Sequence, residues 1–321
     1  MTIRISAIIL LTLLINSIAF AQEEATEEIT ETPKERPVRA AFESGLLFDA
    51  ATTTLQPSKT MEMVIQHRFG YIDSKDKKYD FFGIWGGSNI RVAMNYSILD
   101  NLTVGFGTTK YNKMQDLQIK YRVIEQTRSN SIPITVMLYE VIGQDGSPKT
   151  KWDATPDSIA DKSYKFSNRM SYFTQVVVSR RFNDQLSLQV AGAFTHYNSV
   201  DSLYDHDRIS VSFAGRYKFS PQASIIVSGD FPLKIEGIRD YKRVDLTNKA
   251  TVYNRPNICL GLEISTSTHA FQIYMATAQG ILPQEGIMWN SNYTPESVWN
   301  KDNLFKGNVL IGLNITRLWN F

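Results

Sequence analysis

Few residues in this sequence have the types and spacing that enzyme chemistry needs. The chain has four histidines, His67, His196, His206 and His269, and one cysteine, Cys259. No nucleophile elbow, His-Glu-x-x-His zinc motif, phosphate-binding loop or paired-cysteine motif occurs in the sequence. A single cysteine also cannot form a disulfide within the chain. We therefore expect neither an enzyme nor a bound cofactor.

One short run has the side chains that could hold a metal ion. Asp205, His206 and Asp207 are consecutive, and carboxylate oxygens with an imidazole nitrogen are a plausible donor set for a divalent cation. A solvated loop is the favoured interpretation of this triplet, because it falls in a connection between predicted strands. We therefore expect no metal site.

Charged side chains that alternate with apolar ones point to a different chemistry, the electrostatic selection of ions. In the segment 117–123, Lys120 and Arg122 alternate with apolar neighbours. Seven cations and three carboxylates occupy such positions in the predicted strands: Arg68, Arg91, Lys120, Arg122, Arg181, Arg216 and Lys218, with Glu62, Asp230 and Glu263. Charges around a narrow water-filled lumen set its ion preference. The surplus of cations predicts a weak preference for anions.

The elements that position these side chains are strands of period two. Between 90 and 98, Ile, Val, Met, Tyr and Ile fall on one face, and Arg, Ala, Asn and Ser fall on the other. No run of 18 apolar residues follows the first 21 residues, so a helical membrane protein is excluded. The pattern predicts an all-β fold, a transmembrane antiparallel up-and-down β-barrel of about 12 strands. The predicted strands are 61–71, 88–98, 101–110, 115–124, 131–141, 170–182, 185–197, 207–219, 222–231, 256–267, 270–277 and 306–321.

The lengths of the connections support a barrel rather than a soluble sandwich. Short connections at 99–101, 125–130, 183–184, 220–221 and 268–269 alternate with mostly long ones. Outer-membrane barrels have short periplasmic turns and longer outer loops. We therefore expect both chain ends in the periplasm.

The N-terminal 60 residues fall outside the strand pattern. Residues 1–21 have a basic start, an apolar core and an Ala-Phe-Ala end, which predict a cleaved signal peptide. Residues 22–37 carry six Glu against two cations, with a net charge of −4, and are expected to be a flexible lead-in. Residues 39–60 have three open interpretations: a plug in the lumen, an additional strand, or a segment along the periplasmic rim. The barrel domain is expected at 61–321.

The C-terminal strand ends in an aromatic pattern. Trp319 and Phe321 share a register with the apolar residues before them, although Arg317 interrupts that face. This resembles the terminal strand of outer-membrane barrels, in which a final aromatic residue is read by the barrel assembly machinery. The resemblance implies that the protein lies in the cell outer membrane. Its expected partners are outer-membrane lipid and the barrel assembly machinery, and no nucleic acid is expected.

A further resemblance begins at His67, Arg68, Phe69 and Gly70, and continues through short matches as far as Lys120-Tyr121-Arg122. With these residues the chain resembles an uncharacterised membrane-bound β-barrel family of Bacteroidota-type outer membranes. The resemblance covers most of 40–321. It implies the fold and the location, and no activity.

Two functions of different classes fit these features. A polar lumen without a catalytic constellation favours a passive channel or uptake pore for small solutes. The alternative is a non-conducting structural or assembly component that binds a partner through its outer loops or periplasmic segment. Twelve strands permit both, because eight can be filled by side chains and sixteen or more leave an aqueous channel.

Overall fold

The computed structural model describes residues 35–72, 81–148, 165–200, 206–233, 235, 255–290 and 309–321. The predicted signal peptide and residues 22–34 of the acidic lead-in lie outside the described residues.

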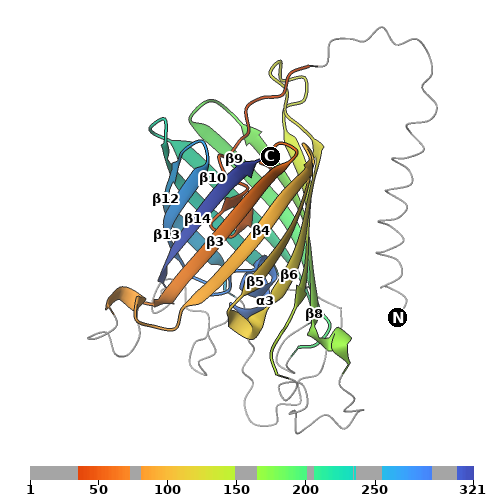
Figure 1. Ribbon diagram of the computed structural model, residues 1–321, viewed down its shortest axis with the longest axis vertical. Coiled ribbons are helices and arrows are strands. Elements are labelled where there is room, and N and C mark those ends of the chain that lie inside the picture. The colour runs from red at the N-terminus through yellow and green to blue at the C-terminus, as the bar shows by residue number, and fades with distance from the viewer. Residues whose placement is uncertain are drawn as a thin grey trace, which may run out of the picture. The chain divides into compact units, whose positions relative to one another are not determined.

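Within these residues, twelve antiparallel strands close into one barrel, in which β14 pairs with β3 (Figure 1). Each remaining strand pairs with its neighbours in sequence, as in an up-and-down barrel. The predicted fold class is confirmed. The strands are β3 Thr60–Tyr71, β4 Asn89–Leu99, β5 Leu102–Thr109, β6 Gln115–Ile124, β7 Thr135–Gln144, β8 Met170–Arg181, β9 Leu186–Tyr197, β10 Asp207–Lys218, β11 Ala223–Leu233, β12 Asn257–Ser265, β13 His269–Ala276 and β14 Leu310–Asn320.

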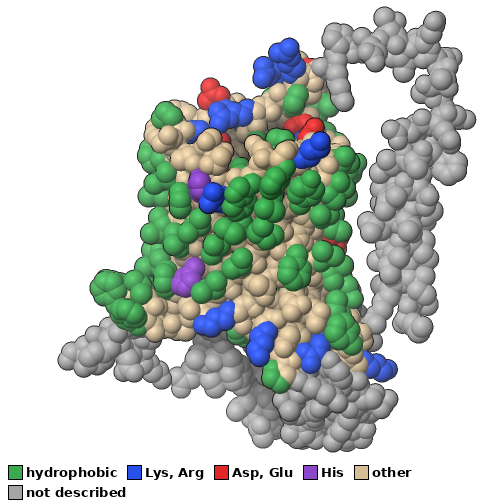
Figure 2. Space-filling model, viewed as in Figure 1, with side chains coloured by type: hydrophobic (Ala, Val, Ile, Leu, Met, Phe, Trp, Pro, Cys, Tyr) green, Lys and Arg blue, Asp and Glu red, His purple; other side chains and the backbone are tan. Residues whose placement is uncertain are grey.

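The strands alternate as the period-two pattern requires. In β4, Arg91, Ala93 and Asn95 are buried towards the lumen, whereas Val92 and Met94 are exposed on the outside. Hydrophobic side chains spread over the barrel wall in Figure 2. The outer face thus suits lipid, while the inner face carries the polar groups.

One predicted strand is displaced. The strand expected at 131–141 is β7, Thr135–Gln144. A turn precedes it, in which the N–H of Thr127 donates to the carbonyl of Ile132 at 3.0 Å and the N–H of Ile132 donates to the Thr127 hydroxyl at 3.0 Å. Pro133 has no N–H for a strand ladder, so pairing starts after it.

The first and the last barrel strand meet at one end of the barrel. We call it the short-turn end, and it carries the connections at 100–101, 125–134, 182–185, 219–222 and 266–268. Thr60 at the start of β3 pairs with Asn320 at the finish of β14. The opposite, long-loop end is where β3, β5, β7, β9, β11 and β13 end. Short helical turns lie there as well: η1 Phe81–Gly83, η2 Tyr111–Lys113 and η3 Phe166–Arg169.

Residues 38–57 occupy the lumen, and we call this segment the plug. It leaves the short-turn end beside Thr127, which bridges to Pro37, and it returns to that end where the N–H of Ser58 donates to Asp100 at 2.8 Å. Between these points it forms a small hairpin, β1 Leu46–Leu47 and β2 Ala50–Ala51. Of the three interpretations of 39–60, the structure therefore shows the plug.

The plug packs against the wall through two apolar clusters. Phe42, Leu47 and Phe48 of the plug pack in the first cluster with side chains of β10 to β14. Ala51 joins the second, with side chains of β7, β8 and β9 and with Ile287. Ile287 belongs to α3, Pro283–Trp289, a buried helix that packs against β8 to β11. Among the described residues, no helix is long and apolar enough to span a membrane.

Candidate functional site

The tip of the plug is fixed by a buried ion pair. Asp49, which follows Phe48 in the turn of the hairpin, accepts a hydrogen bond from Nη2 of Arg68 at 2.7 Å, and the two side chains are 4% and 0% exposed. The Nη1 atom of the same guanidinium donates to the carbonyl oxygens of Ala278 and Gly280. Arg68 of β3 therefore ties the plug to the segment that leads into α3.

The neighbouring residue, Phe48, has an unusual backbone conformation. Its φ of 59° lies in the left-handed region, which is a genuine outlier for a bulky side chain. The wall holds it there: Gln272 accepts from its N–H at 3.0 Å, while Gln66 and Asn314 donate to its carbonyl at 2.9 and 2.7 Å. Its ring packs on Tyr274 at 4.4 Å between centroids. Four wall side chains thus stabilise one strained residue of the plug.

A second anchor lies nearer the short-turn end. Oε1 of Glu43 lies 2.8 Å from Nζ of Lys218 and 3.2 Å from Nη1 of Arg216, and Oε2 lies 3.2 Å from Nη2 of Arg39. Burial by itself would raise the pKa of the Glu43 carboxyl, but the hydrogen bond from Lys218 and the charges of the two arginines outweigh it. The pKa of Glu43 is accordingly held below its ordinary value.

Two further wall charges also bind the plug. Lys120 donates from Nζ to the carbonyl of Gly45 at 2.7 Å. The hydroxyl of Ser44 donates to Oε2 of Glu263 at 2.9 Å. Wall groups that the sequence predicted to face water therefore face the plug.

One charge pair belongs to the wall alone. Arg91 of β4 donates to both carboxylate oxygens of Asp116 of β6, at 3.1 and 2.6 Å, and to Gln66 at 2.8 Å. This is the bidentate geometry that makes arginine–carboxylate pairs strong. The pair reaches the plug through Gln66, which donates to the carbonyl of Phe48.

The helix α3 carries a buried carboxyl group. Glu285 is almost fully buried and accepts a hydrogen bond from the N–H of Leu282 at 3.3 Å. Burial raises the pKa of Glu285 to about 7, despite the backbone hydrogen bonds from Leu282 and Ile281. Neither side-chain polar atom of the adjacent Gln284 has a hydrogen-bond partner among the described residues. Buried polar groups of this kind are usually bonded to ordered water.

The structure divides the ten predicted lumen-lining residues into two groups. Eight face the lumen: Arg68, Arg91, Lys120, Arg216, Lys218, Glu62, Asp230 and Glu263. Arg122 and Arg181 lie instead at the short-turn rim, where they pair with Glu125 at 3.1 Å and Asp184 at 2.7 Å. Both sit at strand ends, where turn carboxylates neutralise them.

Sequence reasoning missed the partners of these cations. Asp116 continues the register of Lys120 in β6, so extending the alternation would have found it. Arg208 of β10 likewise shares the buried face with Arg216. Glu43, Asp49 and Glu285 lie outside the barrel strands, and no local signal points to them.

The four residues of the family-like motif have separate roles. Arg68 points inwards to the plug, as described, whereas His67 and Phe69 point outwards with ring centroids 4.2 Å apart. At Gly70 a Cβ atom would lie 2.9 Å from Cα of Gly86, closer than real Cβ contacts come. Glycine is therefore required where the segment around η1 crosses β3.

The charged triplet considered for metal binding is divided between described and undescribed residues. Asp205 lies outside the described residues. Nδ1 of His206 lies 2.7 Å from the carbonyl of Tyr197, and Asp207 lies 2.5 Å from Nδ1 of His196. Within the described ranges, no group of three His, Cys, Asp or Glu side chains could hold a metal ion.

Two further charged residues interrupt the outer face. Glu140 of β7 points outwards between the inward-facing Tyr139 and Val141, and it accepts a hydrogen bond from the Thr174 hydroxyl at 2.9 Å. Arg317 lies over the ring of Trp319 at 4.8 Å, at the short-turn end. Phe321 is 76% exposed beside it.

Several solved membrane barrels resemble the chain in overall structure. The NanC porin is 8% identical, with a TM-score of 0.46 over 81% of this chain and 99% of that chain. An outer membrane channel from Pseudomonas putida F1 is 13% identical, with a TM-score of 0.42 over 83% and 97%. The KdgM porin is 6% identical, with a TM-score of 0.42 over 82% and 99%. No curated protein matches the sequence.

The sequence itself matches one described family. Residues 42–319 match the "Membrane bound beta barrel domain (DUF5777)". The match begins at Phe42 and ends at Trp319, so it includes most of the plug as well as the barrel. The predicted membrane-bound β-barrel is confirmed, and the chain belongs to the DUF5777 family of membrane-bound β-barrel domains.

Proposed function

We propose that this protein is a non-enzymatic outer-membrane channel for small solutes, of a Bacteroidota-type outer membrane, which the plug closes in the conformation described above. Displacement of the plug opens the lumen, with a weak preference for anions. The short-turn end lies in the periplasm. The observation that carries the proposal is the pairing of the plug carboxylates Glu43 and Asp49 with wall cations.

The charge of the wall supports the anion preference. The eight predicted residues that face the lumen are five cations and three carboxylates, and Arg208 and Asp116 add one charge of each sign, so the inner face carries two more cations than carboxylates. While the plug is in place, Glu43 and Asp49 balance that surplus. Without the plug, Arg68, Arg216 and Lys218 lose their carboxylate partners and face water. Low-dielectric walls focus the resulting positive field along the lumen.

Polar contacts make displacement of the plug physically reasonable. Water can replace the hydrogen bonds that Gln66, Asn314 and Lys120 make to plug carbonyls, because such exchanges cost only about 1 kcal/mol each. The strained φ of Phe48 is relieved when the tip leaves the wall. The exchange with water and the relief of strain thus offset part of the free energy that is lost when the apolar side chains of the plug leave the wall.

Conductance in planar bilayers tests the proposal. Mature full-length protein should show rare, brief openings, whereas a variant lacking residues 38–57 should show a stable conductance. Under a salt gradient its reversal potential should indicate anion preference. Asp49→Arg keeps the chain length and makes the tip of the plug repel Arg68. It should therefore lengthen the open time, as the deletion of residues 38–57 should.

The second candidate is a non-conducting structural component that binds a partner. The apolar packing of Phe42, Leu47 and Phe48 favours it, because displacement of the plug would expose these buried side chains to water. If the variant without residues 38–57 forms a barrel by circular dichroism and does not conduct, this second function replaces the first. In either function we propose that the aromatic C-terminus, Trp319 and Phe321, is recognised by the assembly machinery.

A further inference from the structure

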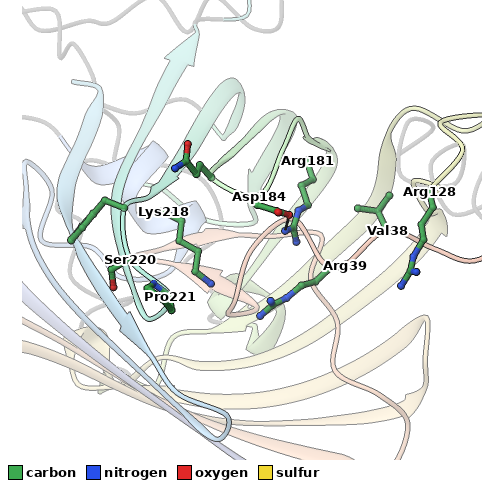
Figure 3. Close-up of a pocket in the computed structure, with 10 residues that line it drawn as sticks. Val38, Arg39, Arg128, Arg181, Asp184, Lys218, Ser220 and Pro221 are labelled. Atoms are coloured by element: carbon green, nitrogen blue, oxygen red, sulfur yellow. Dashed lines mark hydrogen bonds and ion pairs between the residues drawn. The ribbon is translucent and has the colours of Figure 1, made fainter.

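A basic cavity of about 590 Å³ opens at the short-turn end (Figure 3). Its wall is shared between the start of the plug and three separate turns of the barrel. The lining residues are Val38, Arg39, Arg128, Arg181, Asp184, Gln185, Lys218, Phe219, Ser220 and Pro221. Four cations therefore surround this cavity, with one carboxylate among its lining residues.

The cations of the cavity are only partly satisfied by protein groups. Arg181 donates to Asp184 at 2.7 Å, to the carbonyl of Asn183 at 3.2 Å and to the carbonyl of Ala40 at 3.4 Å. Arg128 donates from Nε to the carbonyl of Pro37 at 3.2 Å, which is a neutral partner. Because a guanidinium has five N–H donors and only Nε of Arg128 donates to a described residue, its two Nη groups can donate to an oxyanion in the cavity.

Lys218 and Arg39 share a single carboxylate outside the lining, that of Glu43. Arg216 also forms an ion pair with the Glu43 carboxylate. One negative charge therefore serves three positive ones at the inner edge of the cavity. An anion entering the cavity meets an uncompensated positive field, and the cost of placing it there is low.

We propose that this cavity binds a small organic anion that carries phosphate or carboxylate groups. Arg39 and Arg128 hold its oxygens through charge-assisted hydrogen bonds. Val38, Phe219 and Pro221 contact its carbon skeleton, since they supply the apolar part of the lining. The site stands whether or not the barrel conducts.

Binding at this site acts on the plug. The anion competes with Glu43 for Arg39 and Lys218, and these contacts anchor the plug near the short-turn end. Because coupling between two equilibria is reciprocal, whatever weakens the Glu43 anchor also strengthens the binding of the anion. The anion is thus a ligand that loosens the plug from the periplasmic side.

Isothermal titration calorimetry on the mature protein in detergent tests the site. Glycerol 3-phosphate and citrate are the probes, because they are organic anions that present phosphate and carboxylate oxygens separately. We expect one site for at least one probe, weakened as sodium chloride is raised. Arg128→Gln and Arg39→Gln should each weaken binding by about tenfold or more, the effect of one lost charge-assisted hydrogen bond. Glu43→Gln should strengthen it several-fold.

Lys59→Gln is the matched control, since Lys59 is an exposed cation at the same end that does not line the cavity. It should leave the affinity unchanged. Circular dichroism confirms that each variant remains a barrel. Binding of neither probe to the folded wild-type protein would overturn the site, as would an equal loss in Lys59→Gln. The measurement uses the closed barrel, so its failure is distinct from a failure to conduct.

Discussion

Asp49 and Arg68 form an ion pair of 2.7 Å inside the barrel, although one belongs to the plug and the other to the wall. Both side chains are almost wholly buried. Removing one member of a buried pair leaves an unpaired charge in a low-dielectric site. The contact between plug and barrel should therefore be sensitive to a substitution of either residue.

Arg68→Ala should destabilise the protein by about 3–5 kcal/mol, because Asp49 then remains buried without its cationic partner, although Asn257 still donates to it. Asp49→Ala in the Arg68→Ala background should restore part of that loss. Denaturant unfolding followed by tryptophan fluorescence measures both. Arg317→Ala is the control, since its guanidinium stacks on Trp319 at the rim and should cost no more than about 1 kcal/mol. Equal losses for Arg68→Ala and Arg317→Ala would contradict the buried anchor.

Glu285 gives the protein a pH-dependent stability. Its pKa is about 7 in the folded protein and near 4.5 when unfolded, so the folded state binds the proton more tightly. The stabilisation is complete below pH 4.5 and is lost as the pH rises through about 7. The change amounts to about 3 kcal/mol. Unfolding measured from pH 4.5 to 8 should show this loss, and Glu285→Gln should remove it.

If Glu285→Gln keeps the full pH dependence of stability, another titratable group is responsible for that dependence. Glu43 serves as a comparison, because its pKa is lowered and its contribution to stability therefore changes with pH in the opposite direction. Its contribution is present above pH 4.5 and disappears as the pH falls through the lowered value. The two carboxyl groups therefore affect different sides of the pH range.

Glu140 places a carboxyl group on the lipid face. Glu140→Leu should stabilise the barrel by about 1 kcal/mol in bilayers, because acidic groups on that face are mildly unfavourable. Thr174→Val removes the hydrogen bond to this carboxyl, so it should destabilise the wild-type protein and leave Glu140→Leu unaffected. Additive effects of the two substitutions would show that the contact has no energetic weight.

The orientation of the barrel is tested by epitope tags. A tag inserted after Gly146, at the long-loop end, should be reachable by antibody on intact cells. One inserted after Asp184, in a short turn, should be reachable only after the outer membrane is permeabilised. Labelling in the reverse pattern would place the short-turn end outside the cell.

The sequence by itself determined the barrel. Apolar and polar residues alternate in β4 and β10 with the period that a strand imposes, and each side chain must face either lipid or lumen. That constraint is local, so it can be read from neighbouring residues. The same alternation placed Arg68, Arg91 and Lys120 on the inner face. The strand predicted at 131–141 begins later, at Thr135, because Pro133 has no N–H with which to pair.

Only the tertiary structure decided what fills the lumen. Residues 39–60 have no periodic pattern, and their contacts join positions far apart in the sequence, such as Asp49 with Asn257 and Ser44 with Glu263. The same is true of Glu285, whose environment comes from helix α3 lying inside the wall. Period-two alternation records which face of a strand is polar. It does not record whether water or another part of the chain lies against that face, because both satisfy the same hydrogen-bonding groups.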